Sequence, residues 1–238
     1  MRRSAAFSSW LSGPKRLSAK IRRGGALAER TYRQFGALAA AASVLDRVLN
    51  AVIRAESLKI IVRERSQVRL DPETSTRFTY RPASRADLEA MRLDPRLDID
   101  ESKLRRFDEG DLCLLSFVDG EIAGYTWSHH GNEADLMPGL RISVPSHYFY
   151  DYAALTLPEF RGLGLHALRQ DQLFETEMFS DKAGLIGFVR STNYPMLRTL
   201  PKRGNKTVGT VWLIGGRRHF LAVFSRSARR LGMRRLES

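Results

Sequence analysis

One stretch, Thr156–Leu168, constrains the fold of this chain more than any other. A strand-like run, Tyr152–Leu157, ends at Pro158 and is followed by the turn Arg161–Gly164 and then by apolar residues at helical spacing. Glycines between a strand and a helix let the backbone approach a ligand closely. The first amides of a helix have no partner within it and carry the positive end of the helix dipole. The stretch therefore predicts a phosphate or pyrophosphate site, to which Arg161 adds a charge.

Two glycines in such a turn are also compatible with a tight connection that binds nothing. The turn is not a Walker loop, and it is not a complete dinucleotide fingerprint, because no third glycine stands three residues after Gly164. The downstream sequence favours the phosphate interpretation. Phe188–Asn193 is typical of a strand ending in polar residues, and Tyr194–Leu200 is typical of a short helix with proline near its start, ended by Gly204.

These motifs resemble those of the GNAT superfamily of acyl-CoA N-acyltransferases. The family's phosphate loop, Gln/Arg-x-x-Gly-x-Gly/Ala after a strand, is similar to Glu159–Gly164, with Glu159 in place of Gln or Arg. The family's later motif is an asparagine, a helix and then Gly-Phe. It is similar to Asn193 and Gly204, which stand 11 residues apart, with Asn205 in place of Phe. The resemblance extends over about Arg77 to Val211.

The resemblance implies an α/β (α+β) fold with a GNAT-type mixed central sheet flanked by helices, preceded here by an N-terminal helical arm. It implies that acetyl-CoA or a longer acyl-CoA is the co-substrate, without a metal. The acyl-CoA would lie between the strand ending at Leu157 and the strand ending at Arg190, where a backbone N–H near Leu157 polarises the thioester carbonyl. An amine of a small molecule, peptide or protein would attack directly. The implied cofactor-binding residues are Leu155, Leu157, Arg161, Gly162, Leu163, Gly164, Leu165 and Asn193.

Proton transfer departs from the family's pattern. Many members have a tyrosine seven residues after the motif asparagine that protonates the leaving thiolate, but this chain has Leu200 there. Deprotonating the amine is harder still, because a lysine-like amine has a pKa of about 10.4. We predict Asp151, a carboxylate among aromatic residues, as the base, and His147 as the second candidate. Tyr194 could replace the missing proton donor. A paired or exposed structural carboxylate is the alternative for Asp151.

Charge is distributed unevenly along the 238 residues. Residues 1–70 carry 15 basic and 4 acidic side chains, residues 71–216 carry 17 and 21, and residues 217–238 carry 7 and 1. We therefore predict a basic N-terminal arm and helix over 1–70, an N-acyltransferase domain over 71–216, and a basic strand and helical tail over 217–238. Asp94–Asp111 is rich in acids, either as a solvated face or as a surface for a cationic acceptor.

The basic ends raise a second hypothesis about function. Residues 1–25 lack acids and could be a targeting segment or a basic arm, and residues 26–56 predict a helix too short and charged to span a bilayer. These ends could bind an acyl carrier protein, an anionic membrane or nucleic acid, either for long-chain acyl transfer or on a scaffold without catalysis. The sequence leaves open whether the chain forms a homodimer.

Cysteine and histidine usage disfavours a metal site. Cys113 is the only cysteine and lies in a strand-like run, which predicts a buried structural thiol and a reducing, cytoplasmic location, with peripheral membrane binding as an option. His129 and His130 are adjacent on a predicted strand and so face opposite sides of it. Asp119-Gly120 between two apolar runs predicts a hairpin.

Overall fold

The computed structural model describes residues 29, 31–45, 55–68, 77–137, 140–215 and 220–236. The chain forms two compact units, residues 1–56 and 57–238. In the first unit residues 31–45 are helical, within the helix predicted over 26–56. The prediction for residues 1–25 lies outside the described residues. None of the helices in the described part of the chain has the length and apolar character needed to cross a bilayer.

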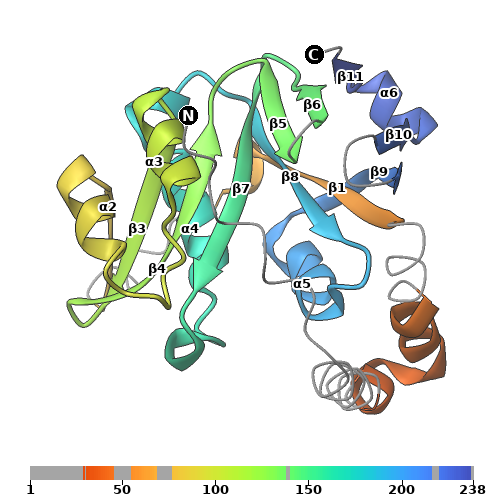
Figure 1. The fold of residues 1–238 in the computed structure, drawn as a ribbon, viewed down its shortest axis with the longest axis horizontal. Coiled ribbons are helices and arrows are strands. Elements are labelled where there is room, and N and C mark those ends of the chain that lie inside the picture. The colour runs from red at the N-terminus through yellow and green to blue at the C-terminus, as the bar shows by residue number, and fades with distance from the viewer. Residues whose placement is uncertain are drawn as a thin grey trace, which may run out of the picture. The chain divides into compact units, whose positions relative to one another are not determined.

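The second unit is built on a mixed sheet of eight strands in the order β10-β9-β1-β8-β7-β4-β3-β2 (Figure 1). A separate sheet of three strands has the order β11-β6-β5. The strands are β1 (Glu56–Glu64), β2 (Phe78–Pro82), β3 (Leu112–Val118), β4 (Glu121–His129), β5 (Glu133–Met137), β6 (Leu140–Ser143), β7 (Tyr148–Thr156), β8 (Gly184–Arg190), β9 (Lys206–Gly215), β10 (Phe220–Phe224) and β11 (Arg235–Leu236). The helices are α2 (Arg85–Met91), α3 (Glu101–Asp108), α4 (Leu165–Leu173), α5 (Tyr194–Thr199) and α6 (Arg226–Arg230).

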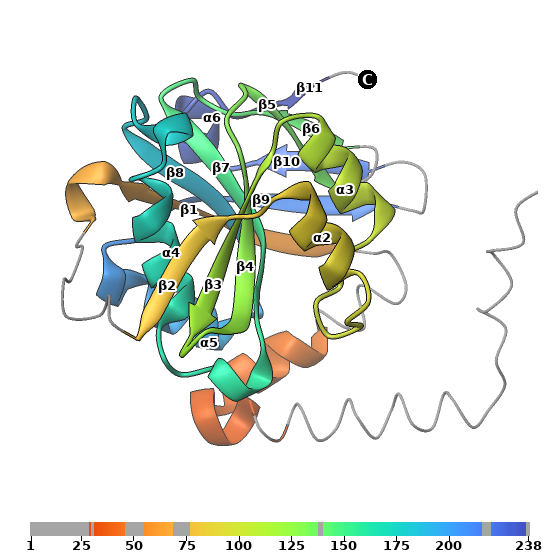
Figure 2. The same cartoon turned by 90° about the vertical axis from the view of Figure 1, so that its left-hand side faces the viewer.

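Helices cover both faces of strands β3 and β4. Figure 2 shows α2 and α3 on one side of these strands and α4 on the other. The alternation along β3 explains the arrangement, because Cys113 and Leu115 pack with Leu88 of α2 and Leu104 of α3, whereas Leu114 packs on the α4 side. A mixed α/β fold with helices flanking the central sheet is thus confirmed, and so is the buried thiol of Cys113.

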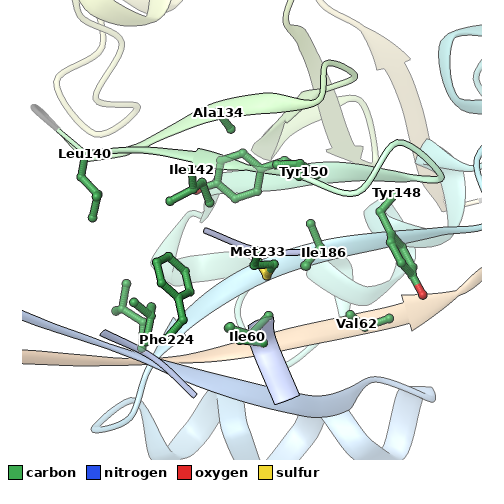
Figure 3. Close-up of a cluster of buried hydrophobic side chains, with 14 of the residues drawn as sticks. Ile60, Val62, Ala134, Leu140, Ile142, Tyr148, Tyr150, Ile186, Phe224 and Met233 are labelled. Atoms are coloured by element: carbon green, nitrogen blue, oxygen red, sulfur yellow. The ribbon is translucent and has the colours of Figure 1, made fainter. Parts of the chain in front are cut away.

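The small sheet and the C-terminal segment close a second core against the other half of the large sheet. Figure 3 shows Ile142 and Leu140 of the small sheet and Met233 near its last strand, together with Ile60 of β1 and Phe224 of β10. The side chains of all five are buried. Apolar burial is the main force that holds these layers together.

The charge boundaries predicted near residues 70 and 217 do not coincide with boundaries of the fold. Strand β1 lies inside the large sheet between β9 and β8, and β10 pairs with β9 beyond residue 217. Charge is carried mainly by side chains that face solvent, so it reports little about which strands pair. The burial pattern of β1, with Ile60, Ile61 and Val62 all buried, shows its place in the sheet more directly.

The predicted hairpin is confirmed by the pairing of β3 with β4. Asp119 and Gly120 both have positive φ, at 50° and 84°. Two such residues match the right-handed twist of the flanking strands, which is why Asp-Gly is favoured between them.

Strand β7 contains an irregularity that bears on the site. Tyr125 and Trp127 of β4 pair with Leu155 and Tyr152 of β7, so β7 has one extra residue in this interval. Ala153 has φ of 46°, which is unusual for a residue with a side chain. This combination is a β-bulge, a feature that re-aims the strand and breaks its pairing locally.

The bulge generates a prediction about stability. Replacing the exposed Ala153 by glycine should raise the free energy of unfolding by about 0.5–1 kcal/mol, because glycine adopts positive φ without the cost of about 1–2 kcal/mol to an L-residue. Ala154→Gly is the matched control, since Ala154 is also exposed but is not among the residues with positive φ. It should lower stability by a similar amount. Urea denaturation of both variants measures this, and equal losses would contradict the bulge geometry.

Candidate functional site

The candidate site lies where two parallel strands separate. Strands β7 and β8 pair from Tyr148 with Gly184 to Asp151 with Gly187, and the register ends there. Strand β7 continues to Thr156 and β8 to Arg190, so their carboxyl ends diverge, as Figure 1 shows. A cavity of about 470 Å³ opens at this fork and is lined by residues of β7, β8, α4 and α5. Ligands commonly bind at the carboxyl ends of parallel strands.

The loop after β7 forms one end of the site. Gly162 and Gly164 have φ of 88° and 76°, which glycine adopts without strain. Helix α4 begins directly after Gly164, and its first internal hydrogen bonds run to the Gly164 carbonyl from the N–H groups of Ala167 and Leu168, at 3.0 and 3.2 Å. The preceding amides of the helix therefore have no partner within it and are available to an anion.

Two arginines flank this helix terminus. Arg161 lines the cavity, and its Nε donates to the Thr156 carbonyl oxygen at 3.2 Å. Arg203, in the turn after α5, has its Nη2 only 3.2 Å from the position that a Cβ on Gly164 would occupy. The sequence indicated Arg161, but Arg203 was missed because it lies about 40 residues further along the chain. Both cations add to the positive potential of the helix N-terminus.

Helix α4 presents polar side chains to the cavity rather than an apolar face. Arg169 is fully buried, and its two terminal nitrogens donate to Ser116 Oγ at 2.7 Å and Thr156 Oγ1 at 2.8 Å. Burial lowers the pKa of this guanidinium to about 10, with the charge of Asp151 opposing the effect. The group remains charged at neutral pH, so the cavity wall contains a buried cation.

Asp151 stands at the end of the β7–β8 pairing and lines the same cavity. It is 6% exposed, and each carboxylate oxygen accepts a hydrogen bond, from Thr126 Oγ1 at 2.6 Å and from Gln170 Nε2 at 2.8 Å. These bonds satisfy a buried charge that would otherwise be costly. They also fix the carboxylate to β4 and α4.

His166 is a further titratable group in this cavity. Burial lowers the pKa of its imidazole to about 4, and the charges of Arg169 and Arg63 lower it further, whereas Asp151 acts in the opposite direction. The ring is therefore neutral at pH 7. We did not predict His166, Arg169 or Gln170 from the sequence, where the helix was read only through its apolar positions. The signal was their i, i+3 and i+4 spacing, which places polar groups on one helix face.

A second polar cluster occupies the opposite face of β7. The Tyr152 hydroxyl donates to Asp111, and His129 Nδ1 lies 2.5 Å from the other oxygen of that carboxylate. The Arg106 guanidinium is centred 4.9 Å from the Tyr152 ring. The hydrogen bond to Asp111 raises the pKa of His129, and burial together with Asp111 raises the pKa of Tyr152. Tyr152 also lines the cavity, so this cluster borders the fork from the side of α3.

The predicted site residues fall into three groups. Those that line the cavity are Asp151, Leu155, Arg161 and Asn193. Those in or beside the phosphate loop are Gly162, Leu163 and Gly164, which are exposed, and Leu165 and Leu157, which are buried in the core. His147 and Tyr194 do not line the cavity; His147 is exposed in the turn before β7, at the opposite end of the strand from the fork, and Tyr194 is the first residue of α5.

The structure narrows the choice of the backbone N–H expected near Leu157. The Leu157 N–H donates to the Ala123 carbonyl oxygen at 2.9 Å, so it is not free to polarise a carbonyl. The reason is that β7 stays beside β4 up to its end. Within the described sheet, Ala153 and Ala154 of the bulge have no register partner in β4 or β8. Their peptide groups are the better candidates for this role.

The acidic run is neutralised locally. Asp94 pairs with Arg96, Asp98 with Lys103 and Asp108 with Arg85, while Asp100 caps α3 and Asp111 contacts Tyr152 and His129. The acidic side chains of this run therefore make local contacts within the loops around α2 and α3. Among the described residues, no group of three or more histidine, cysteine, aspartate or glutamate side chains is arranged to hold a metal ion.

Comparisons with known proteins give matches in fold. No family model matches the chain, and no curated protein matches it. Among solved structures, a GNAT-family protein from Novosphingobium aromaticivorans is 14% identical, with a TM-score of 0.47 over 68% of this chain and 65% of that one. A GCN5-related N-acetyltransferase from Kribbella flavida is 16% identical, with a TM-score of 0.46 over 69% and 59%.

A third structure, of a predicted acetyltransferase from Clostridium acetobutylicum with acetyl-CoA, is 17% identical, with a TM-score of 0.35 over 51% of this chain and 87% of that one. The chain spans less than two thirds of the length of the first two proteins. At these identities and TM-scores the likeness is a partial one of fold and says nothing of activity.

The loop geometry predicts how glycine substitutions will act. Gly164→Glu should abolish binding of CoA, because the added carboxylate would stand at the helix N-terminus where the anion is expected. Gly162→Ala is the control, since its Cβ would have nothing within 4 Å and its φ is similarly positive. It should bear a similar backbone strain but retain most of the affinity. Calorimetric titration with CoA measures both, and equal affinity of Gly164→Glu and the unsubstituted protein would contradict the phosphate site.

Proposed function

We propose that this protein is an N-acyltransferase that moves an acyl group from acyl-CoA to an amine. The observation that carries the proposal is that the fork cavity is lined by Arg161 and His166, the residues on either side of the glycine loop at the start of α4. The cavity lining includes three arginines, Arg161, Arg169 and Arg190, and one carboxylate, Asp151. A positive cavity that leads from a helix N-terminus to a strand opening suits a ligand with a phosphate at one end and a narrow arm at the other.

The fork would place the thioester beside the bulge of β7. A peptide N–H at Ala153 or Ala154 would then donate to the thioester carbonyl oxygen as negative charge develops on it. The amine would attack the carbonyl carbon, the bond from carbon to sulfur would break, and CoA would leave as thiolate. Holding both reactants in one cavity supplies much of the rate, because a bimolecular step becomes effectively intramolecular.

Native mass spectrometry of the purified protein tests the donor class. We expect a mass shift that matches CoA or an acyl-CoA, either co-purified or after addition of acetyl-CoA, and calorimetry should give a defined affinity. Acetyl-CoA incubated with a mixture of primary amines should release free thiol, measured with a thiol reagent. Absence of CoA binding at millimolar concentration would contradict the proposal.

Asp151 remains the predicted base, and its contacts sharpen the prediction. Asp151→Asn should lower kcat far more than KM for acyl-CoA. It should also lower stability by about 1–3 kcal/mol, because a buried hydrogen-bonding group loses a matched partner. Gln170→Met separates the two roles, since it removes one partner but leaves the carboxylate in place. Full turnover of Asp151→Asn across pH, with reduced stability, would make the residue structural.

A further inference from the structure

His166 occupies an unusual position for a histidine in this fold. It lies two residues after Gly164, in the first turn of α4, and it lines the cavity that contains Asp151 at the end of the strand pairing. It is therefore placed between the phosphate loop and the fork. A ligand that extends through the cavity from the loop towards Asp151 can therefore contact this side chain.

The imidazole is half-buried, and no hydrogen bond to another described residue contributes to its lowered pKa. Burial has the largest effect on its pKa, and the nearby charges are those of Asp151 of β7, Arg169 of its own helix and Arg63 of β1. Arg203 and Arg161 add positive charge at the same helix terminus. Burial, together with more cations than anions around the ring, keeps the imidazole neutral while the cavity holds no anionic ligand.

We propose that His166 contacts the phosphate-bearing arm of an acyl-CoA-type ligand and takes up a proton when that ligand binds. The inference rests on the proposed function and adds a residue and a proton to it. A pyrophosphate at the start of α4 brings negative charges that oppose those of the arginines. An opposite charge within about 4–6 Å raises a histidine pKa by about 1–3, which brings the ring from neutral to partly protonated near pH 6.

Proton uptake can be counted without an acceptor amine. Calorimetric titrations with dephospho-CoA at pH 6.0, in buffers of different ionisation enthalpy, give the number of protons bound from the dependence of heat on buffer. Dephospho-CoA is chosen because it lacks the terminal phosphate monoester, whose own pKa of about 6 would add a proton of its own. We expect the unsubstituted protein to take up protons when it binds dephospho-CoA at pH 6.0, and to take up fewer at pH 7.5.

Substitutions of His166 test whether this residue takes up the proton. His166→Asn and His166→Gln should bind at least about three-fold more weakly at pH 6.0 and lose the proton uptake, whereas the unsubstituted protein and the variants should converge in affinity at pH 7.5. His130→Asn is the matched control, because His130 is exposed and lies outside the cavity lining. It should retain the uptake. Thermal melts identify a variant that fails to fold, and the second substitution then carries the test.

The outcomes separate the two proposals. If the unsubstituted protein binds dephospho-CoA without proton uptake, or if both His166 variants keep that uptake, the role of His166 is overturned and the acyl-CoA site stands. If the unsubstituted protein binds neither CoA nor dephospho-CoA, the proposed function and this inference both fail. The His166 ring can also be titrated by nuclear magnetic resonance in the free and the bound protein. The midpoint of its titration must rise by at least one pH unit on binding.

Discussion

The parallel pairing of β7 with β8 ends at Asp151 and Gly187, and the candidate site depends on that ending. Each strand keeps its other neighbour beyond this point. Strand β7 stays beside β4 up to Thr156, and β8 stays beside β1 up to Arg190. The sheet is thus paired on both sides of the opening. The bulge at Ala153 and the absence of a side chain at Gly187, where a Cβ would lie 3.3 Å from the Asp151 carbonyl oxygen, suit this separation.

Helix α4 supports the fork through buried polar contacts. Arg63 of β1 forms an ion pair with Asp171 and donates to the Ala167 carbonyl oxygen, while Arg169 connects the helix to Ser116 of β3 and Thr156 of β7. Buried ion pairs contribute little net stability, because desolvation opposes the attraction. Their geometry is nevertheless demanding. These contacts therefore fix the register of the helix against the strands, and with it the direction in which its N-terminus points.

The sequence revealed the parts of the site that are contiguous in the chain. The strand, the glycine turn and the helix start were readable because hydrophobic period and glycine placement are local signals. The short helix after Asn193 was readable for the same reason, and Asn193 does cap it by accepting from the Met196 N–H. The position of β1 within the large sheet could not be predicted, because strand pairing between residues distant in sequence gives no local sequence signal.

Polar residues inside α4 were missed for a related reason. A helix with Arg169, Gln170 and Asp171 in succession looks solvent-exposed, yet all three are buried. Their partners come from β3, β7 and β1, so only the folded chain shows which groups they contact, and Arg169 Nε and Gln170 Oε1 still have no hydrogen-bond partner among the described residues. Burial of such groups goes against the usual preference of charged residues for the surface. Conflicts between a local rule and the observed structure gather at functional or strained sites, and here they gather around one cavity.

The two faces of β7 offer different chemistry to that cavity. On the α4 side stand Asp151 and His166 with the arginines, an environment suited to an anionic donor. On the α3 side stands Tyr152, bound to Asp111. Because successive side chains of a strand point to opposite faces, Asp151 and Tyr152 cannot serve the same side of the fork. A donor bound from the α4 side would leave the α3 side for the acceptor. The acids of the loops around α2 and α3 are paired with neighbouring cations, so under the proposed function the aromatic and hydrogen-bonding groups of the fork would be the first candidates to contact the acceptor.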